Sequence, residues 1–265
     1  MADLTRPEEW ARFYGAKVSF GRLNRWVNRR IIERELYDQM AAVMPHGAGA
    51  SLIEMGCANS DWLPYYWSTH GCSVYGIDYL EEGCRLAERK LEQSNCDTFS
   101  IFCGDFRELH ETVGRRFDVL VSFGVIEHFE DPATLIAAFG GYLRENGLMI
   151  TVCPNTAGFA MHMQKYVDKA VYDGHLRFDL EQLIDHHRRG GFEPVHASYL
   201  GFLSLNNLDF SGYRHTGSIL KMLVKLTNGP LVAMCYVFQK LGLPAGNPRL
   251  YAAMMVAARK TAAGS

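Results

Sequence analysis

The sequence predicts an α/β protein built around a mostly parallel sheet with helices on both faces. Between residues 50 and 153, short apolar runs alternate with longer amphipathic segments, which is the pattern of strand–helix–strand units. The first run ends in a turn of small residues that begins at Gly56, and the second run ends at Asp78. This spacing fits one helix and one strand of a right-handed crossover, so both turns fall at the carboxyl edge of the sheet.

The hydrophobic pattern predicts each element in chain order. Apolar runs predict strands, and the amphipathic segments between them predict helices. The expected strands cover 50–55, 72–78, 98–103, 117–122 and 148–153, and the expected helices cover 61–69, 79–93 and 132–144, with a short helix before the fourth strand. A helix over 180–189, a strand over 192–198 and a final strand over 251–259 complete the core.

The chain also carries an amino-terminal segment and two long interruptions. Residues 10–44 have helical periodicity, so we expect residues 1–46 to form a helical cap on a main domain of residues 47–265. Residues 154–178 and 200–247 are too long for ordinary connections and predict two insertions. The first carries histidine and aromatic side chains typical of a lid or substrate-recognition segment. The second is apolar and covers either its own core, a second subunit, a substrate cavity or a membrane surface.

Composition disfavours several classes of function. The 265 residues carry a formal net charge of −2, which gives no global reason to expect a nucleic-acid partner. The amino terminus lacks an apolar signal core, and seven cysteines are scattered without a Cys-x-x-Cys pair, so we expect a reduced, cytoplasmic protein. No run reaches the roughly 18 apolar residues of a membrane span, and no cluster has metal-ligand spacing. We therefore expect neither a membrane span nor a metal.

The turn after the first strand has the chemistry of a nucleotide-type cofactor site. A turn of small residues brings bare backbone close to a ligand, and an acid at the end of the next strand can accept hydrogen bonds from a ribose. Gly56 and Asp78 stand at these two places. A dinucleotide site would prefer Gly-x-Gly-x-x-Gly, and the third glycine is absent from residues 56–61. An NAD(P)-dependent oxidoreductase is thus disfavoured but stays an alternative, as does a catalytically silent cofactor-binding scaffold.

Glu54 and the turn from Gly56 resemble motif I of class I S-adenosylmethionine-dependent methyltransferases of the small-molecule type, Glu/Asp-x-Gly-x-Gly-x-Gly. Ala58 and Ser60 stand where the later glycines usually are. Five later segments also resemble the family and follow in its order. They are the second strand at 74–78, the turn at 103–106, the fourth strand at 117–123, the loop at 124–132 and the segment with the fifth strand at 143–152. The resemblance spans roughly residues 48–155.

This resemblance implies a Rossmann-like, seven-stranded, mostly parallel sheet whose last strand is antiparallel to its neighbours. It implies S-adenosylmethionine as the cofactor and transfer of its methyl group to an oxygen or nitrogen of a small organic acceptor. By the same resemblance, Asp78 accepts from the ribose hydroxyls and Asp105 from the adenine amine, while Glu54 helps to orient the methionyl part. The residues expected to bind the cofactor are Glu54, Gly56, Cys57, Ala58, Asp78, Tyr79, Gly104, Asp105, Phe106 and Phe123.

His128 is the candidate general base for the reaction. It follows the fourth strand, and an imidazole can take a proton near neutral pH, although a histidine in this loop can equally pack on the cofactor or bond the backbone. The amino-terminal helix and the two insertions are expected to form the acceptor site. The residues expected to bind the acceptor are Tyr14, His162, Tyr166, His175 and Phe202. A homodimer is left open.

Overall fold

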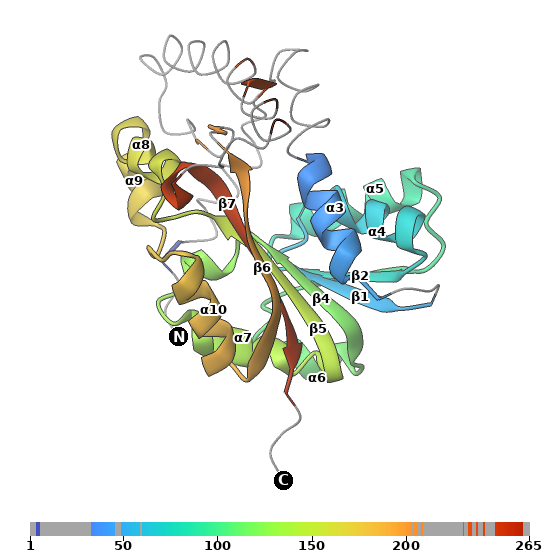
Figure 1. The fold of residues 1–265 in the computed structure, drawn as a ribbon. Helices are drawn as coiled ribbons and strands as arrows, with labels where there is room; N and C mark the ends of the chain where they lie inside the picture. The colour runs from blue at the N-terminus through green and yellow to red at the C-terminus, as the bar shows by residue number, and fades with distance from the viewer. Residues whose placement is uncertain are drawn as a thin grey trace.

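A twisted seven-stranded sheet forms the centre of the computed structural model (Figure 1). The structure describes residues 4–5, 33–45, 49–58, 60–202, 204–205, 208, 230, 233–234, 237, 241 and 247–261. The strands are β1 (Ser51–Met55), β2 (Ser73–Asp78), β3 (Phe99–Cys103), β4 (Phe117–Phe123), β5 (Leu143–Pro154), β6 (Phe192–Phe202) and β7 (Tyr251–Lys260). Their spatial order is β3-β2-β1-β4-β5-β7-β6. The first five strands are parallel, and β7 is antiparallel to both β5 and β6, as the resemblance implies.

Helices cover both faces of this sheet. The described helices are α3 (Glu33–Val43), α4 (Trp62–His70), α5 (Glu81–Gln93), α6 (His110–Val113), α7 (Pro132–Gly140), α8 (Phe159–Val167), α9 (Lys169–Asp173) and α10 (Leu180–Arg189). Helices α3, α4 and α5 lie on one side of the sheet, and α7 and α10 lie on the other (Figure 1). None of the described helices is long and apolar enough to cross a membrane.

Local sequence signals explain where the helices begin. Asp131 precedes α7 and its carboxylate accepts a hydrogen bond from the Thr134 amide, while Pro132 occupies the first turn, where its missing N–H is not needed. Asp179 begins α10 with a capping box, in which its carboxylate accepts from the Gln182 amide and the Gln182 side chain accepts from the Asp179 amide. These caps fix the helices that cover one face of the sheet.

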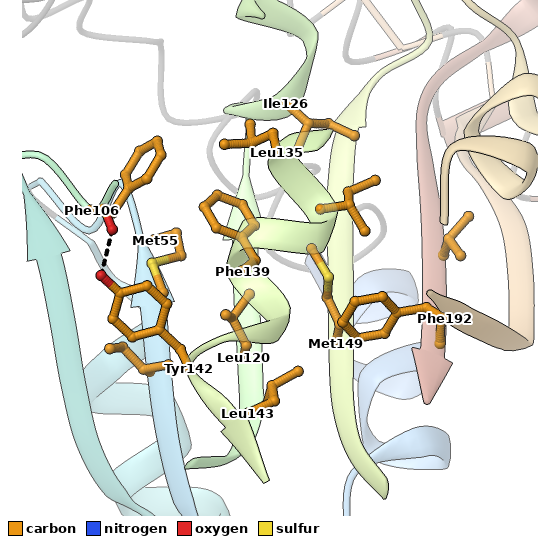
Figure 2. Packing of buried hydrophobic residues seen from close by; sticks show 14 of the residues in the cluster. Met55, Phe106, Leu120, Ile126, Leu135, Phe139, Tyr142, Leu143, Met149 and Phe192 are labelled. Atoms are coloured by element: carbon orange, nitrogen blue, oxygen red, sulfur yellow. Dashed lines mark hydrogen bonds between the residues drawn. The ribbon is translucent and has the colours of Figure 1, made fainter. Parts of the chain in front are cut away.

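Two apolar layers hold the helices on the sheet. One layer packs side chains of α7 and α10 on the strands, and Figure 2 shows Phe139 and Leu135 of α7 above Leu120 of β4 and Met149 of β5. The hydroxyl of Tyr142 donates to the carbonyl of Phe106 within this layer (Figure 2). The other layer joins the opposite face of the strands to α3, α4 and α5. The core is therefore continuous across the sheet and leaves the carboxyl edge of its strands for a site.

Three boundaries differ from the sequence prediction, namely the end of α7, the start of β5 and the end of β6. The helix expected over 132–144 ends at Gly140, because Gly140 and Gly141 stop it and the chain enters β5 at Leu143. Strand β6 continues to Phe202, so the second insertion begins after residue 202 rather than at 200. The first insertion contains the two short helices α8 and α9. Of the expected amino-terminal cap, only residues 4–5 and 33–45 lie within the described residues, and most of 200–247 lies outside them.

Candidate functional site

The turn after β1 needs a glycine at position 56. Gly56 has a φ of +75°, and its amide and that of Cys57 both donate to the carbonyl of Ile77, at 2.9 and 3.1 Å. A Cβ atom on Gly56 would lie 2.8 Å from Cγ2 of Val125, which belongs to the loop after β4. The bare backbone of this turn therefore lies directly against a second loop at the same edge of the sheet.

Ala58 and Ser60, which replace the usual later glycines, are both accommodated by their neighbours. A Cβ atom on Gly83 would lie 2.5 Å from the Cβ of Ala58, so a glycine in α5 makes the room that Ala58 occupies. The Ser60 hydroxyl donates to the carboxylate of Glu54 at 2.6 Å and accepts from the Trp62 amide at 3.0 Å. Burial raises the pKa of Glu54 to about 8, and the Ser60 hydrogen bond opposes this shift. In the structure Glu54 thus supports the turn.

Asp78 links the same turn to the end of β2. Its side chain is buried, and its two carboxylate oxygens accept from the amides of Ala58 at 2.9 Å and Leu80 at 2.8 Å. Burial raises the pKa of Asp78, and these backbone donors act in the opposite direction. A carboxylate held in this way is rigid and faces the space beside the turn.

A cavity opens at this edge of the sheet. Its walls come from the turn after β1, the end of β2, the turn after β3, the loop after β4 and the amino-terminal segment. The lining residues are Thr5, Gly56, Asp78, Tyr79, Leu80, Phe106, Phe123, Gly124, Val125, His128 and Phe129. Aromatic walls, bare glycine backbone and one buried carboxylate fit a nucleoside with a cationic tail, which is what S-adenosylmethionine presents.

The expected cofactor residues fall into two groups around this cavity. Gly56, Asp78, Tyr79, Phe106 and Phe123 line it directly. The other five, which are Glu54, Cys57, Ala58, Gly104 and Asp105, are not among its lining residues. Their part in binding stays a prediction.

The turn after β3 is fixed by its own contacts. The Gly104 amide donates to the Asp78 carbonyl at 2.8 Å. The carboxylate of Asp105 accepts from Nε of Arg107 at 2.9 Å. Burial raises the pKa of Asp105, but hydrogen bonds and the charge of Arg107 outweigh this and hold the pKa below its usual value. Asp105 is therefore an ionised, paired carboxylate beside the cavity wall that Phe106 forms.

Aromatic stacking supports one wall of the cavity. The rings of Trp62 and Phe123 are stacked, with centroids 4.7 Å apart and planes inclined by 9°. Trp62 begins α4, directly after the turn that follows β1, and was not among the predicted site residues. Its position could have been inferred only from knowing that this turn and the end of β4 are neighbours.

His128 lies in the short turn η2 (Ile126–His128), and its imidazole lines the cavity. Nδ1 of His128 is 2.9 Å from the carbonyl of Gly174, and the amide of Leu4 donates to the His128 carbonyl at 2.7 Å. Burial lowers the pKa of His128 to about 3, the nearby His175 adds to this shift, and the Gly174 hydrogen bond opposes it. Such an imidazole is neutral and weakly basic, so its role as a general base stays a prediction.

The expected acceptor residues do not converge. His175 is half-buried, and its ring centroid lies 4.4 Å from that of His128. His162 is exposed on α8, and Tyr166 on the same helix is 74% exposed. Phe202 packs edge-on against Tyr251. Tyr14 lies outside the described residues. Of the four that the structure describes, His175 is the one with a ring contact to a residue of the cavity.

Glu127 is a site residue that the sequence analysis did not select. It is fully buried, and neither carboxylate oxygen has a hydrogen-bond partner within the part of the chain that the structure describes. Burial raises its pKa to about 8. Glu127, His128 and His175 bring one potential ligand atom each to within 4.8 Å of one another. The first two are adjacent in the sequence and the third is in the first insertion, so no local spacing reveals the group.

Comparison with known proteins identifies the family. A family model described as a methyltransferase domain matches residues 23–197. The chain is 28% identical over 176 residues to a ubiquinone biosynthesis O-methyltransferase of Cereibacter sphaeroides, which covers 62% of this chain and 68% of that protein. It is also 28% identical over 160 residues to a protein of the same description from Ruegeria pomeroyi, with 56% of this chain and 62% of that protein covered.

Solved structures share the fold at low identity. A geranyl diphosphate C-methyltransferase from Streptomyces coelicolor has a TM-score of 0.57 and 9% identity, covering 86% of this chain and 79% of that chain. A phosphoethanolamine N-methyltransferase 2 from Haemonchus contortus, solved with S-adenosylmethionine, has a TM-score of 0.56 and 16% identity. The match covers 87% of this chain and 53% of that chain. With the family match over residues 23–197 and the order of the sheet, the protein belongs to the methyltransferase-domain family and is a class I S-adenosylmethionine-dependent methyltransferase.

Proposed function

We propose that the protein methylates a hydroxyl oxygen of a small organic acceptor. One observation carries the proposal: a single cavity is lined both by Asp78, the carboxylate suited to the cofactor, and by His128, which belongs to a buried polar group in the loop after β4. The named relatives from Cereibacter sphaeroides and Ruegeria pomeroyi, which are O-methyltransferases, support oxygen rather than nitrogen as the attacking atom.

Different side chains of the cavity would have different roles in the reaction. S-adenosylmethionine, when bound, supplies an already activated methyl group, so the protein must mainly align the acceptor and exclude water. Asp78 and the Gly56 turn would hold the nucleoside. Phe106, Phe123 and the stacked Trp62 would exclude water from its base. The buried polar group that includes His128 would face the acceptor oxygen.

The alternatives have less support. The turn at residues 56–61 lacks the third glycine of a dinucleotide site, and the family match is to methyltransferases, so an NAD(P)-dependent oxidoreductase is disfavoured. A cofactor-binding scaffold without activity would share the cavity, and only a turnover measurement separates it from an enzyme.

The test begins with cofactor binding and ends with turnover. Calorimetric titration should show binding of S-adenosylhomocysteine and none of NADH. A radiolabelled methyl-transfer assay should then show label on an oxygen when small phenols and catechols are offered, and mass spectrometry of the product locates the new methyl group. Methylation of amines but not of hydroxyls would contradict the proposal, as would tight S-adenosylhomocysteine binding without transfer to any acceptor of the panel.

We also propose a homodimer and a cytoplasmic location. Among the described residues of the second insertion, Met234, Val237 and Leu241 expose 46%, 52% and 69% of their surface, and they are three and four positions apart in the sequence. Such side chains suit a contact between two copies of the chain. Light scattering coupled to size-exclusion chromatography measures the mass and checks the dimer. The cytoplasmic location rests on the scattered cysteines alone and needs a fractionation experiment.

A further inference from the structure

A buried acid without a partner stands beside the cofactor cavity. Both carboxylate oxygens of Glu127 lack a hydrogen-bond partner among the described residues, although the side chain has no exposed surface. An ionised, unpaired buried carboxylate is costly, and proteins offset that cost by keeping the group protonated, by pairing it or by coordinating a metal with it. A cation beside Glu127 would therefore stabilise its ionised form in place of the proton.

Two imidazoles face this acid with their tautomers fixed. Nδ1 of His128 lies 2.9 Å from the Gly174 carbonyl, and Nδ1 of His175 lies 2.6 Å from the Val171 carbonyl. A carbonyl can only accept, so each Nδ1 carries the proton and the lone pair of each ring is on Nε2. Metal-binding histidines are oriented in this way, by a second-shell bond from the other ring nitrogen.

The three side chains are close enough to share an ion. Their potential ligand atoms lie within 4.8 Å of one another. A point equidistant from three atoms at that separation is about 2.8 Å from each, whereas bonds from nitrogen or carboxylate oxygen to zinc are about 2.0–2.2 Å. Each ligand atom would move by less than about 1 Å to complete the site.

The backbone holds the two segments of this cluster together. The Leu176 amide donates to the Glu127 carbonyl at 2.7 Å, beside the bond between His128 and Gly174. These bonds join the loop after β4 to the end of the first insertion. The ligand atoms are therefore positioned before any ion arrives, which lowers the entropic cost of binding one.

The cluster also adjoins the cofactor cavity. His128 is one of the cavity residues. Gly124 is another, and a Cβ atom on Gly124 would lie 3.6 Å from Oε1 of Glu127. An ion held by these side chains would thus be next to the space where the acceptor meets the cofactor.

We propose that Glu127, His128 and His175 form a binding site for a divalent transition-metal ion that holds the acceptor oxygen. This inference rests on the proposed O-methyl transfer and names how the acceptor would be bound. Two imidazoles and one carboxylate leave open positions on the ion for the oxygen of a ligand. The sequence predicts no metal because it contains no cluster with metal-ligand spacing, and His175 comes from a distant segment.

The site would assist methyl transfer by favouring the deprotonated acceptor. The O–H bond of the acceptor breaks, and its proton passes to solvent. A lone pair of the oxygen forms the new O–C bond to the methyl carbon, while the electron pair of the C–S bond returns to sulfur and leaves S-adenosylhomocysteine. No oxidant or further reactant is required.

Cobalt binding by the full chain tests the site without any turnover. Protein treated with a chelator is titrated with Co²⁺, the visible absorption is followed, and the bound metal is counted by mass spectrometry. We expect one Co²⁺ per chain, displaced by Zn²⁺. Glu127→Gln and His175→Asn should each weaken Co²⁺ binding by at least about 100-fold, since even second-shell changes cost 10–100-fold. Glu130→Gln, an exposed acid in the same loop, should bind Co²⁺ as the wild type does.

The control measurements separate this inference from the proposed function. Glu127→Gln replaces a buried acid, whose pKa burial raises to about 8, with a neutral side chain of the same shape, so the melting temperature of the metal-free variant should be close to that of the wild type, which shows that the fold is intact. Equal Co²⁺ affinity in the wild type and in folded Glu127→Gln would overturn the metal site. Calorimetry with S-adenosylhomocysteine on the same metal-free protein reports on the cofactor site alone. Cofactor binding and methyl transfer that persist without a metal would leave the proposed function standing and refute the metal site.

Discussion

Asp78 does two things with one carboxylate. It accepts from the Ala58 and Leu80 amides, which fixes the turn after β1, and it faces the cavity, where ribose hydroxyls can donate to the same oxygens. A carboxylate oxygen has two lone pairs, so both kinds of contact can coexist. The residue that we propose to bind the cofactor therefore also fixes the turn beside the cavity.

Asp78→Asn should weaken the binding of S-adenosylmethionine by about 1.5–3 kcal/mol, which is roughly 10- to 150-fold in the dissociation constant. The amide keeps one acceptor oxygen for the backbone but loses the charge that strengthens the hydrogen bonds. Isothermal titration calorimetry measures the change. Asp97→Asn provides the matched control, because Asp97 is exposed just before β3. The affinity of this variant for S-adenosylmethionine should equal that of the wild type. Unchanged affinity in folded Asp78→Asn would remove Asp78 from the site.

The residues of the site differed in how far the sequence could predict them. Gly56 and Asp78 were predictable because each ends a strand, and the carboxyl ends of neighbouring parallel strands lie at one edge. Glu127 was not predicted, and the sequence suggested His175 for the acceptor site without indicating its contact with His128, because that contact depends on how the first insertion folds back. Thr5 lines the cavity from the amino-terminal segment, and no pattern in its surroundings indicates that contact.

The first insertion is an element that is closed at its base by side chains. The Thr156 hydroxyl donates to the Phe178 carbonyl at 3.0 Å and accepts from the Phe178 amide at 2.9 Å. Nδ2 of Asn155 donates to the carbonyls of Pro248 and Tyr251, both at 3.0 Å. These bonds tie the start of the insertion to its end and to the beginning of β7. The position of His175 next to His128 depends on this closure.

Thr156→Val should lower the free energy of unfolding by about 1–3 kcal/mol, because a buried amide and a buried carbonyl lose their partner in an almost isosteric change. The insertion should also close less well, so the KM for the acceptor rises while the affinity for S-adenosylhomocysteine stays the same. Urea denaturation, steady-state kinetics and calorimetry give the three quantities. Thr112→Val on the exposed surface of α6 is the matched control and should leave all three unchanged. Parallel losses of cofactor affinity in Thr156→Val would show that the insertion supports the cofactor site instead.

Element boundaries show where local patterns stop being informative. The sequence places a helix over 132–144, yet Leu143 already pairs with Phe117 in the sheet. The apolar periodicity continues through this turn because Tyr142 and Leu143 are buried by tertiary contacts on either side of it. The helix ends at Gly140 and Gly141, and a prediction from apolar periodicity alone does not take these glycines into account.

At the scale of the whole molecule, one face of the sheet buries an acid, Glu54, and the other face buries a base, His187. Burial raises the pKa of Glu54 to about 8. His187 is fully buried in α10, where it bonds Thr151 and the Leu183 carbonyl, and burial lowers its pKa to about 4. The topology that brings these groups inside was predictable from the order of strands and helices. Their burial was not, because charge and polarity alone would place them at the surface.

These two shifts predict how stability depends on pH in the protein without cofactor. As pH rises from 4.5 to about 8, the unfolded chain loses the Glu54 proton while the folded protein keeps it, so the free energy of unfolding falls. As pH falls from 6.5 to about 4, the unfolded chain protonates His187 while the folded protein does not, so stability falls again. Between pH 4.5 and 6.5 the two effects oppose each other, and stability should be greatest there.

Glu54→Gln and His187→Gln should each reduce the slope on one side of this profile, while Glu127 and His128, whose pKa values are shifted in the same two directions, keep part of it. Glutamine can accept from Ser60 in place of Glu54 and can reach Thr151 in place of His187, but it does not titrate. Glu54→Gln should therefore gain stability relative to the wild type as pH rises above 4.5, by up to about 1.4 kcal/mol per pH unit, and His187→Gln should gain it as pH falls below 6.5. Urea denaturation from pH 4 to pH 8.5 measures both differences, and each variant serves as the control for the other. A Glu54→Gln curve that runs parallel to the wild type over this whole range would show that Glu54 is ionised in the folded protein and that Ser60 and the turn solvate its charge.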